Sequence, residues 1–286
     1  MFAVFTDRHW LWFAAGFYLL GFLAGTVSLL RGGRPSGTLM YALVAVGCAL
    51  QLIGLGERGK AVGGCPLGNT FETVQFTAWS AISLYLVVGV VFRSSLLGYL
   101  TASLMAALTI ISLSIHSWDS PSRAPLFGGN PWIELHAALA VFSYGVFALL
   151  ALTALLFLFR HFSLKSKNLD GWFFFLPSIF DLDRIALRLL SFGVALLAAS
   201  LAVGSIYWIR ESAVVTPAKL LTLTVWIAYA AALVLRLRGR LLARRFAWTC
   251  VILFAAALIS LRLVDSSRQE LQMVRASVGA IWTGGR

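Results

Sequence analysis

The run GCPLGNTFETVQFTAW, residues 64–79, places polar side chains directly before a long apolar stretch. Its proline, asparagine, glutamate and glutamine stand at the start of an apolar segment that continues to Phe92. A helix needs about 20 mainly apolar residues to cross a bilayer. The run therefore marks the entry of a polar loop into a predicted transmembrane helix, a place where polar clusters are commonly functional.

The whole chain has the composition of a membrane protein. Of its 286 residues, 60% are hydrophobic and 12% are charged, which leaves too little polar surface to cover a soluble globule. We expect an all-α fold, a polytopic transmembrane helical bundle that forms one integral membrane domain over residues 1–286. About eight apolar runs of spanning length recur, at approximately residues 9–30, 38–55, 70–92, 96–115, 132–159, 185–209, 218–235 and 246–263.

The distribution of lysine and arginine predicts the orientation of the bundle. These residues are more frequent in the loops after the first, third, fifth and seventh predicted spans than in the loops on the other side. Since basic loops stay on the cytoplasmic side, both termini are expected to be extracytoplasmic. The arginine-containing tail 265–286 has its apolar residues on one helical face, so it could also lie along the membrane surface.

The charge and the cysteines exclude several classes of protein. The formal net charge of +12 is spread over membrane-flanking loops, so we expect the bilayer and no nucleic acid as a partner. Of the three cysteines, Cys48 and Cys250 lie in predicted spans and Cys65 lies alone in a loop. The sequence contains no Cys-x-x-Cys pair, no Cys-x-x-Cys-His haem-attachment site and no convergent nucleophile and base, so no enzyme activity is predicted.

The polar residues of the run 64–79 have two interpretations. Asn69 followed three residues later by Glu72 is typical of a capping box, and capping alone accounts for both. One face of the predicted helix also carries polar groups at its mouth and flat rings deeper in, namely Glu72, Gln75, Phe76 and Trp79. The second interpretation is that this face lines a site for a flat amphipathic ligand.

A second helix start lies at Asn130-Pro131, because asparagine caps helices and proline suits the first helical position. His136 follows within two turns, and Tyr144 continues its helical face. A neutral imidazole at this position can bind iron axially, whereas the competing interpretation is a histidine that hydrogen-bonds a neighbouring span or water. His116 ends the fourth predicted span on the same side of the membrane and is a candidate second ligand.

These segments resemble the cytochrome c assembly protein family, which includes CcsA-type and HemX-type membrane proteins. Residues 64–79 are similar to the family pattern Gly-x-Pro-Leu-x-Asn-x-x-Glu-x-x-x-Phe-x-x-Trp. Leu135-His136 with Ser143-Tyr144 resembles a family helix whose histidine is associated with axial ligation of haem. The resemblance covers most of the chain and implies that His136 is the metal ligand of a haem cofactor.

The chain departs from the CcsA-type pattern after the sixth predicted span. Residues 216–219 read Thr-Pro-Ala-Lys, without the tryptophan and aspartate of the family's haem loop. Val234 stands where CcsA-type members have a histidine, and no histidine follows His161. The resemblance is therefore closer to the HemX-type branch, which lacks the tryptophan-rich loop.

The resemblance implies a bacterial inner-membrane accessory protein for cytochrome c assembly or haem maturation, with haem at the outer face between the third, fourth and fifth spans. In this hypothesis His136 is the axial ligand, Glu72 and Gln75 form hydrogen bonds near the rim, and Phe76, Trp79 and Tyr144 pack on the macrocycle. The haem propionates would lie near Arg58, Lys60 or Arg123. Other cytochrome c maturation or haem biosynthesis proteins are the expected partners.

Two other classes of function stay open at this point. One is a cofactor-free membrane scaffold or regulator of haem biosynthesis that holds partners through the basic loop 236–245. The other is a small-solute transporter, which is less favoured because the spans lack paired charges deep in the bilayer.

Overall fold

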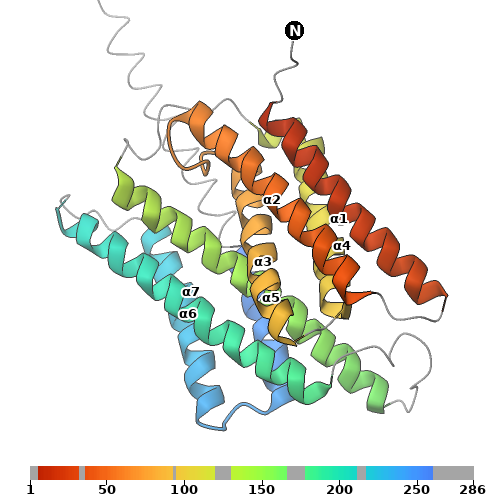
Figure 1. Cartoon of the computed structure of the whole chain (residues 1–286). Coiled ribbons are helices and arrows are strands. Elements are labelled where there is room, and N and C mark those ends of the chain that lie inside the picture. The colour runs from red at the N-terminus through yellow and green to blue at the C-terminus, as the bar shows by residue number, and fades with distance from the viewer. Residues whose placement is uncertain are drawn as a thin grey trace, which may run out of the picture.

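The computed structural model describes residues 6–31, 36–92, 95–119, 130–165, 178–210 and 217–259, and these residues form helices and short connections without a strand. In chain order the helices are α1 (Asp7–Leu30), α2 (Gly37–Val62), α3 (Thr70–Phe92), α4 (Ser95–Ser114), the short 3-10 helix η1 (His116–Trp118), α5 (Pro131–Lys165), α6 (Ile179–Arg210) and α7 (Pro217–Leu237). A further helix covers residues 243–259 (Figure 1).

The predicted all-α membrane bundle is confirmed. A helix lies at each of the predicted spans, and α1, α2, α5, α6 and α7 are long and apolar enough to cross a bilayer. The orientation of the termini stays a prediction, and the tail 265–286 and Arg123 lie outside the described residues.

Three helices are longer than the hydrophobic pattern predicts. α2 continues past Leu55 to Val62 and is followed by the cap residue Gly63, whose φ of 69° is the left-handed conformation that glycine favours. α5 runs on to Lys165, and α6 begins at Ile179, where the Ser178 hydroxyl accepts a hydrogen bond from the Asp181 amide at 3.1 Å. The extra turns carry polar side chains, so hydropathy alone does not detect them.

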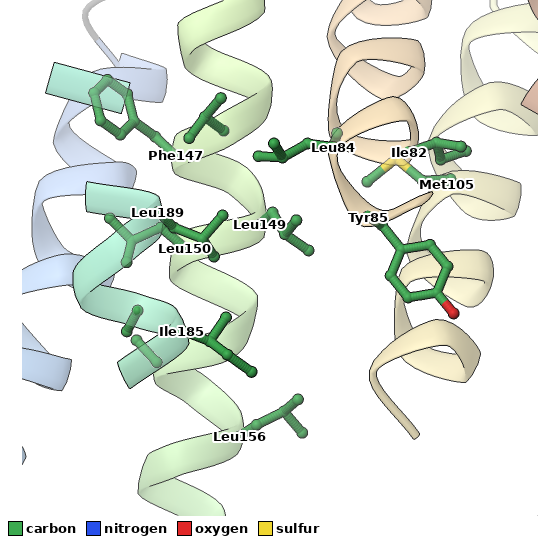
Figure 2. Close-up of a cluster of buried hydrophobic side chains, with 14 of the residues drawn as sticks. Ile82, Leu84, Tyr85, Met105, Phe147, Leu149, Leu150, Leu156, Ile185 and Leu189 are labelled. Atoms are coloured by element: carbon green, nitrogen blue, oxygen red, sulfur yellow. The ribbon is translucent and has the colours of Figure 1, made fainter. Parts of the chain in front are cut away.

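The helices form two groups that meet at α3. α1 and α2 lie antiparallel with α4 against α1, and α5 and α6 form a long antiparallel pair beside α7 (Figure 1). α3 contacts α2 and α4 on one side and α5 on the other. Figure 2 shows apolar side chains of α3, α4, α5 and α6 in the continuous core that joins the groups.

The contact between α3 and α5 depends on a glycine. A Cβ atom at Gly145 of α5 would lie 1.7 Å from the Ser80 hydroxyl oxygen of α3 and 2.9 Å from the Ala81 amide nitrogen. Those distances are far below van der Waals contact, so only glycine permits this approach of the two backbones. The residues on the two helices are thereby held in fixed register.

Candidate functional site

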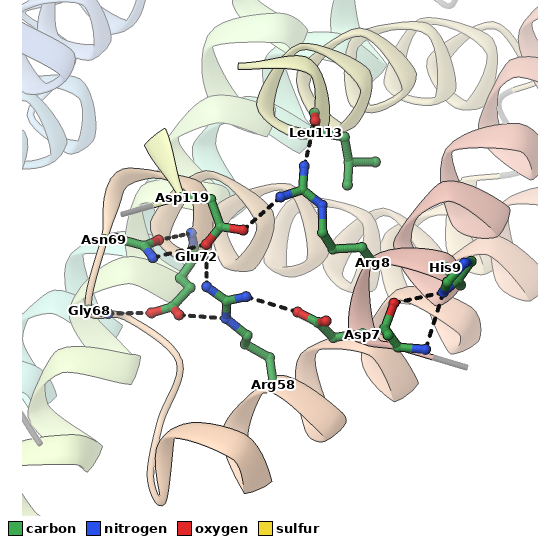
Figure 3. Close-up of polar contacts among 10 residues, drawn as sticks. Asp7, Arg8, His9, Arg58, Gly68, Asn69, Glu72, Leu113 and Asp119 are labelled. Carbon is green, nitrogen blue, oxygen red and sulfur yellow. Dashed lines mark hydrogen bonds and ion pairs between the residues drawn. The ribbon is translucent and has the colours of Figure 1, made fainter. Parts of the chain in front are cut away.

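A network of charged side chains joins α1, α2, α3 and η1 at the predicted outer end (Figure 3). Arg58 of α2 donates to Glu72 of α3 at 2.8 Å, to Asp7 of α1 at 3.0 Å, and to Asp119 directly after η1. The Glu72 side chain is 1% exposed, and those of Arg58, Asp7 and Asp119 are 16%, 18% and 11% exposed. Largely removed from water, these charges depend on one another for compensation.

Arg8 extends the network. Its guanidinium donates to Asp119 at 2.8 Å and to the Leu113 carbonyl at 2.7 Å, so it ties α1 to the end of α4. The guanidiniums of Arg8 and Arg58 each lie 5.5 Å from the centre of the Phe71 ring. Two arginines and three carboxylates therefore connect four parts of the chain that are far apart in sequence.

Glu72 has a structural role in this arrangement. Its amide donates to the Asn69 side-chain oxygen at 2.8 Å, which confirms the predicted cap. One carboxylate oxygen accepts from Arg58, and the other accepts from the Gly68 amide at 2.6 Å. Both oxygens of Glu72 are thus engaged inside the protein.

Gln75 lies one turn deeper in a buried chain of hydrogen bonds. Its carbonyl oxygen accepts from the Gln51 amide at 2.8 Å, and the Gln51 oxygen accepts from the Tyr18 hydroxyl at 2.9 Å. The Gln75 amide donates to the Ser112 hydroxyl at 2.8 Å. Gln75 therefore joins α3 to α1, α2 and α4.

Phe76 and Trp79 belong to a different surface of α3. The ring centres of Phe76 and Trp79 are 5.6 Å apart, and the ring of Phe142 in α5 lies 6.3 Å from that of Trp79. All three rings are partly exposed. The predicted stripe on α3 thus divides into a polar pair used between helices and an aromatic pair near α5.

His136 of α5 is directed toward α6. Its Nδ1 lies 2.6 Å from the Ser200 carbonyl oxygen, which can only accept, so Nδ1 carries the proton. The Ser200 hydroxyl donates to the His136 carbonyl at 2.8 Å. In the neutral ring the lone pair is then on Nε2, and metal-ligating histidines in proteins are commonly oriented in this way.

The His136 ring also packs against Gly204 of α6. A Cβ atom at position 204 would lie 2.7 Å from Nδ1 and 2.8 Å from the Cε1 carbon. The ring therefore rests on the backbone of α6, one turn beyond Ser200. The absence of a side chain at Gly204 allows the ring to take this position, and the hydrogen bond to the Ser200 carbonyl fixes its tautomer.

The predicted site residues on α3 and α5 have different neighbours. Gly145, which faces α3, lies nine positions after His136 and so about 180° around the helix from it. Tyr144 is 5% exposed within the hydrophobic core. His116 is exposed in η1, with Nδ1 3.3 Å from the Ser114 carbonyl oxygen. The His136 ring contacts α6. A haem position between the third, fourth and fifth helices stays a prediction.

The loop between α2 and α3 lies against the start of α5. A Cβ atom at Gly64 would be 2.5 Å from a carboxylate oxygen of Glu134. Burial, with the negative charges of Glu134 and Glu72, raises the pKa of Cys65 to about 11. Cys65 is therefore a thiol rather than a thiolate at neutral pH.

The roles of several residues at the predicted outer end of the bundle were not predicted from the sequence. Arg58 was expected near a ligand carboxylate, but its guanidinium is already shared by three protein carboxylates. The sequence did indicate that Asp7, Arg58 and Asp119 all fall at the predicted outer end. It gave no indication of the roles of Ser200 and Gly204, since small residues are common throughout α6.

Among the described residues, no group of three His, Cys, Asp or Glu side chains is placed to hold a metal ion.

Comparison with known proteins identifies the family. The family model for the cytochrome C assembly protein matches residues 67–272, more than two thirds of the chain. Protein HemX of Bacillus subtilis is 27% identical over 194 residues, covering 66% of this chain and 69% of HemX, and Protein HemX of Brevibacillus brevis is 27% identical over 178 residues, covering 62% and 65%.

Cytochrome c biogenesis protein CcsA of Chlamydomonas reinhardtii is 27% identical over 194 residues. This similarity covers 65% of the chain but only 53% of CcsA. The chain thus spans about two thirds of the HemX relatives and about half of this CcsA, and it contains the residues that suggested the resemblance. It is a membrane protein that belongs to the cytochrome c assembly protein family.

Proposed function

We propose that the protein is an accessory factor of cytochrome c assembly or haem maturation in the bacterial inner membrane, and that it holds haem through His136 at the predicted outer ends of α5 and α6. The observation that carries this proposal is the hydrogen bond from His136 Nδ1 to the Ser200 carbonyl oxygen. Metal-ligating histidines in proteins are commonly oriented by such a hydrogen bond to a backbone carbonyl, and histidine is a usual axial ligand of haem iron.

The surroundings of His136 fit a haem ligand. Bound haem would supply an iron centre and a large flat apolar ring. Every residue from 131 to 142 of α5 is at least partly exposed, whereas residues 144–151 are mostly buried. The outer part of α5 is thus the more accessible part, and a ring held there would replace lipid or water rather than packed core.

The residues of α3 take different roles in this proposal. Glu72 and Gln75 hold α3 in the bundle through Arg58, Gln51 and Ser112, so the proposal assigns them no contact with haem. Phe76 and Trp79 form an aromatic surface with Phe142 on the other side of α5. They support the position of α5, and His136 alone carries the proposed metal bond.

The relatives give the proposal its cellular setting. The similar CcsA is a cytochrome c biogenesis protein, and the similar proteins of Bacillus subtilis and Brevibacillus brevis are HemX. We infer a binding role without catalysis, together with cytochrome c maturation or haem biosynthesis proteins as partners. Val234 has a hydrocarbon side chain without an atom that can bind iron, so it supplies no second haem ligand.

Visible absorption spectra of purified protein test the proposal. Wild-type protein from haem-replete cells should show a Soret band, and His136→Ala should lose most of it, because the variant lacks the nitrogen that would hold the iron. His161→Ala, at the opposite end of α5, is the matched control and should keep the band. A variant His116→Ala tests whether the second histidine of this end contributes.

Cytochrome c maturation in cells provides the second readout. In a strain lacking the native protein, His136→Ala should fail to restore covalent haem attachment, while His161→Ala should restore it. Unchanged haem content and unchanged maturation in His136→Ala would overturn the haem mechanism. A colourless wild type that does not take up added haemin would favour the cofactor-free scaffold.

A further inference from the structure

The turn after α7 exposes a cluster of arginines. α7 ends at Leu237, and helix 243–259 begins after a tight connection. The exposed arginines of this turn are Arg238, Arg240, Arg244 and Arg245. Within the described part of the chain, the ion pair of this region belongs to the neighbouring Arg236, which binds Asp183 of α6.

The turn has a defined shape. Gly239 has a φ of 69°, and the amides of Gly239 and Arg240 donate to the carbonyls of Arg236 and Leu235, both at 3.0 Å. Arg236 also donates to the Leu241 carbonyl at 2.7 Å. Its guanidinium therefore closes the turn from inside.

Arg236 is also fixed on its apolar side. The guanidinium carbon lies 5.1 Å from the centre of the Phe246 ring, at the start of helix 243–259. Arg236 is thus committed to the fold, and the four exposed arginines are presented on a fixed frame rather than on a loose loop.

The position of two arginines is unfavourable for their own helix. Arg244 and Arg245 lie in the first turn of helix 243–259, where the helix dipole disfavours positive charge. The Arg244 guanidinium lies 5.8 Å from the Phe162 ring of α5, which fixes its direction without neutralising its charge. Local helix stability therefore does not account for this charge.

Apolar side chains accompany the arginines. Leu237 is 67% exposed and Leu242 is 65% exposed, one on each side of Gly239. Arginines and exposed leucines on one turn match the boundary between phosphate headgroups and acyl chains. A purely aqueous loop would gain nothing from these leucines.

We propose that the turn 237–245 is a binding surface for anionic phospholipids, with Arg238, Arg240, Arg244 and Arg245 as the groups that contact the headgroup phosphates. Guanidinium groups bind phosphate oxygens with paired hydrogen bonds. Leu237 and Leu242 contact the first carbons of the acyl chains. This surface is independent of His136, since it lies at the opposite end of the bundle (Figure 1).

Lipid competition in native mass spectrometry tests the proposal. Delipidated full-length protein is given equal amounts of dioleoyl phosphatidylglycerol and dioleoyl phosphatidylcholine, which share acyl chains and differ in headgroup charge. Wild-type protein should retain phosphatidylglycerol with about a tenfold preference. The variant R238Q/R240Q/R244Q/R245Q should fall to less than about twofold.

Two control variants locate the effect. R238K/R240K/R244K/R245K keeps the positive charge and should retain most of the preference, because lysine binds phosphate as a point charge. R184Q/R188Q removes two exposed arginines of α6 outside the turn and should change it little. If the quadruple glutamine variant fails to fold, R238Q/R240Q and R244Q/R245Q are measured separately, and each should lose part of the preference.

Three results would overturn the proposal: no headgroup preference in wild type, an unchanged preference in the glutamine variants, or an equal loss in R184Q/R188Q. Capture of an acidic protein by a wild type without lipid preference, lost in the glutamine variants, would assign the turn to a protein partner instead.

Discussion

In the α1–α4 group, buried charges and amides join one helix to another, whereas between α5 and α6 a single histidine rests on a backbone carbonyl and a glycine. The side chains of Arg58, Glu72 and Gln75 form hydrogen bonds with other helices and with the connections beside them. His136 uses Nδ1 for a hydrogen bond to the Ser200 carbonyl oxygen of α6. Glu72 and Gln75 of the family-like segment 64–79 therefore join helices, and our proposal places the haem ligand on α5.

Among the changes considered for the α1–α4 group, replacing Arg58 should lower the stability of the protein most. Arg58→Met leaves three carboxylates without their shared partner and should lower the free energy of unfolding by about 3–5 kcal/mol. Unfolding in mixed micelles measures this change. Lys60→Met is the matched control, because Lys60 is 76% exposed and its pair with Glu57 should contribute about 0.5 kcal/mol or less. Equal losses in both variants would contradict a special role for the network.

The buried amide chain should give a smaller effect. Gln75→Leu leaves the Gln51 amide without its side-chain acceptor and should cost about 1–3 kcal/mol in the same unfolding measurement. The double variant Gln51→Leu/Gln75→Leu removes both partners. It should cost less than the sum of the two single variants, and strict additivity would show that the two amides do not act as a pair.

Gly204→Ala tests the contact between His136 of α5 and the backbone of α6. The added methyl would displace the His136 ring from the Ser200 carbonyl, so haem affinity should fall about tenfold while the helical fold is kept. Haem content and circular dichroism measure the two properties. Gly56→Ala is the control, since a Cβ atom at Gly56 meets nothing within 4 Å. A Soret band of full strength in Gly204→Ala would show that the position of the ring is not critical.

The smallest predicted effect is a pH dependence at Cys65. With a pKa of about 11, only about one Cys65 in a thousand is a thiolate at pH 8, so iodoacetamide should label it slowly, with a rate that rises about tenfold per pH unit up to pH 11. The measurement uses a variant in which Cys48 and Cys250 are serine. Glu134→Gln removes a negative charge that raises the pKa and should speed labelling several-fold. Labelling at the rate of a free cysteine at pH 7 would contradict the burial of this thiol.

The sequence predicts where the helices of this molecule lie along the chain better than it predicts which neighbouring helix each side chain faces. The spans, the Asn69 cap and the start of α5 at Pro131 follow from hydropathy and capping residues. A helical face can be read from spacing, but spacing does not say which neighbour that face meets. Glu72 and His136 therefore appeared to converge, although α3 directs Glu72 to Arg58 and α5 directs His136 to α6.

Partners that are distant in sequence explain the other errors. Arg58 binds residues 7, 72 and 119, and His136 binds residue 200, so each contact exists only after the helices have packed. The length of α2 has the same cause. Its last polar turns resemble a loop in sequence, and ion pairs with other helices stabilise them as helix.

Ligand rescue tests the axial role of His136 most directly. His136→Gly removes the imidazole and leaves room for a free one, so purified His136→Gly should lack the Soret band of wild type, and added imidazole should restore it. Imidazole added to Gly204→Ala should have a much smaller effect, because its histidine is still present. A full Soret band in His136→Gly without imidazole would contradict haem ligation by this residue.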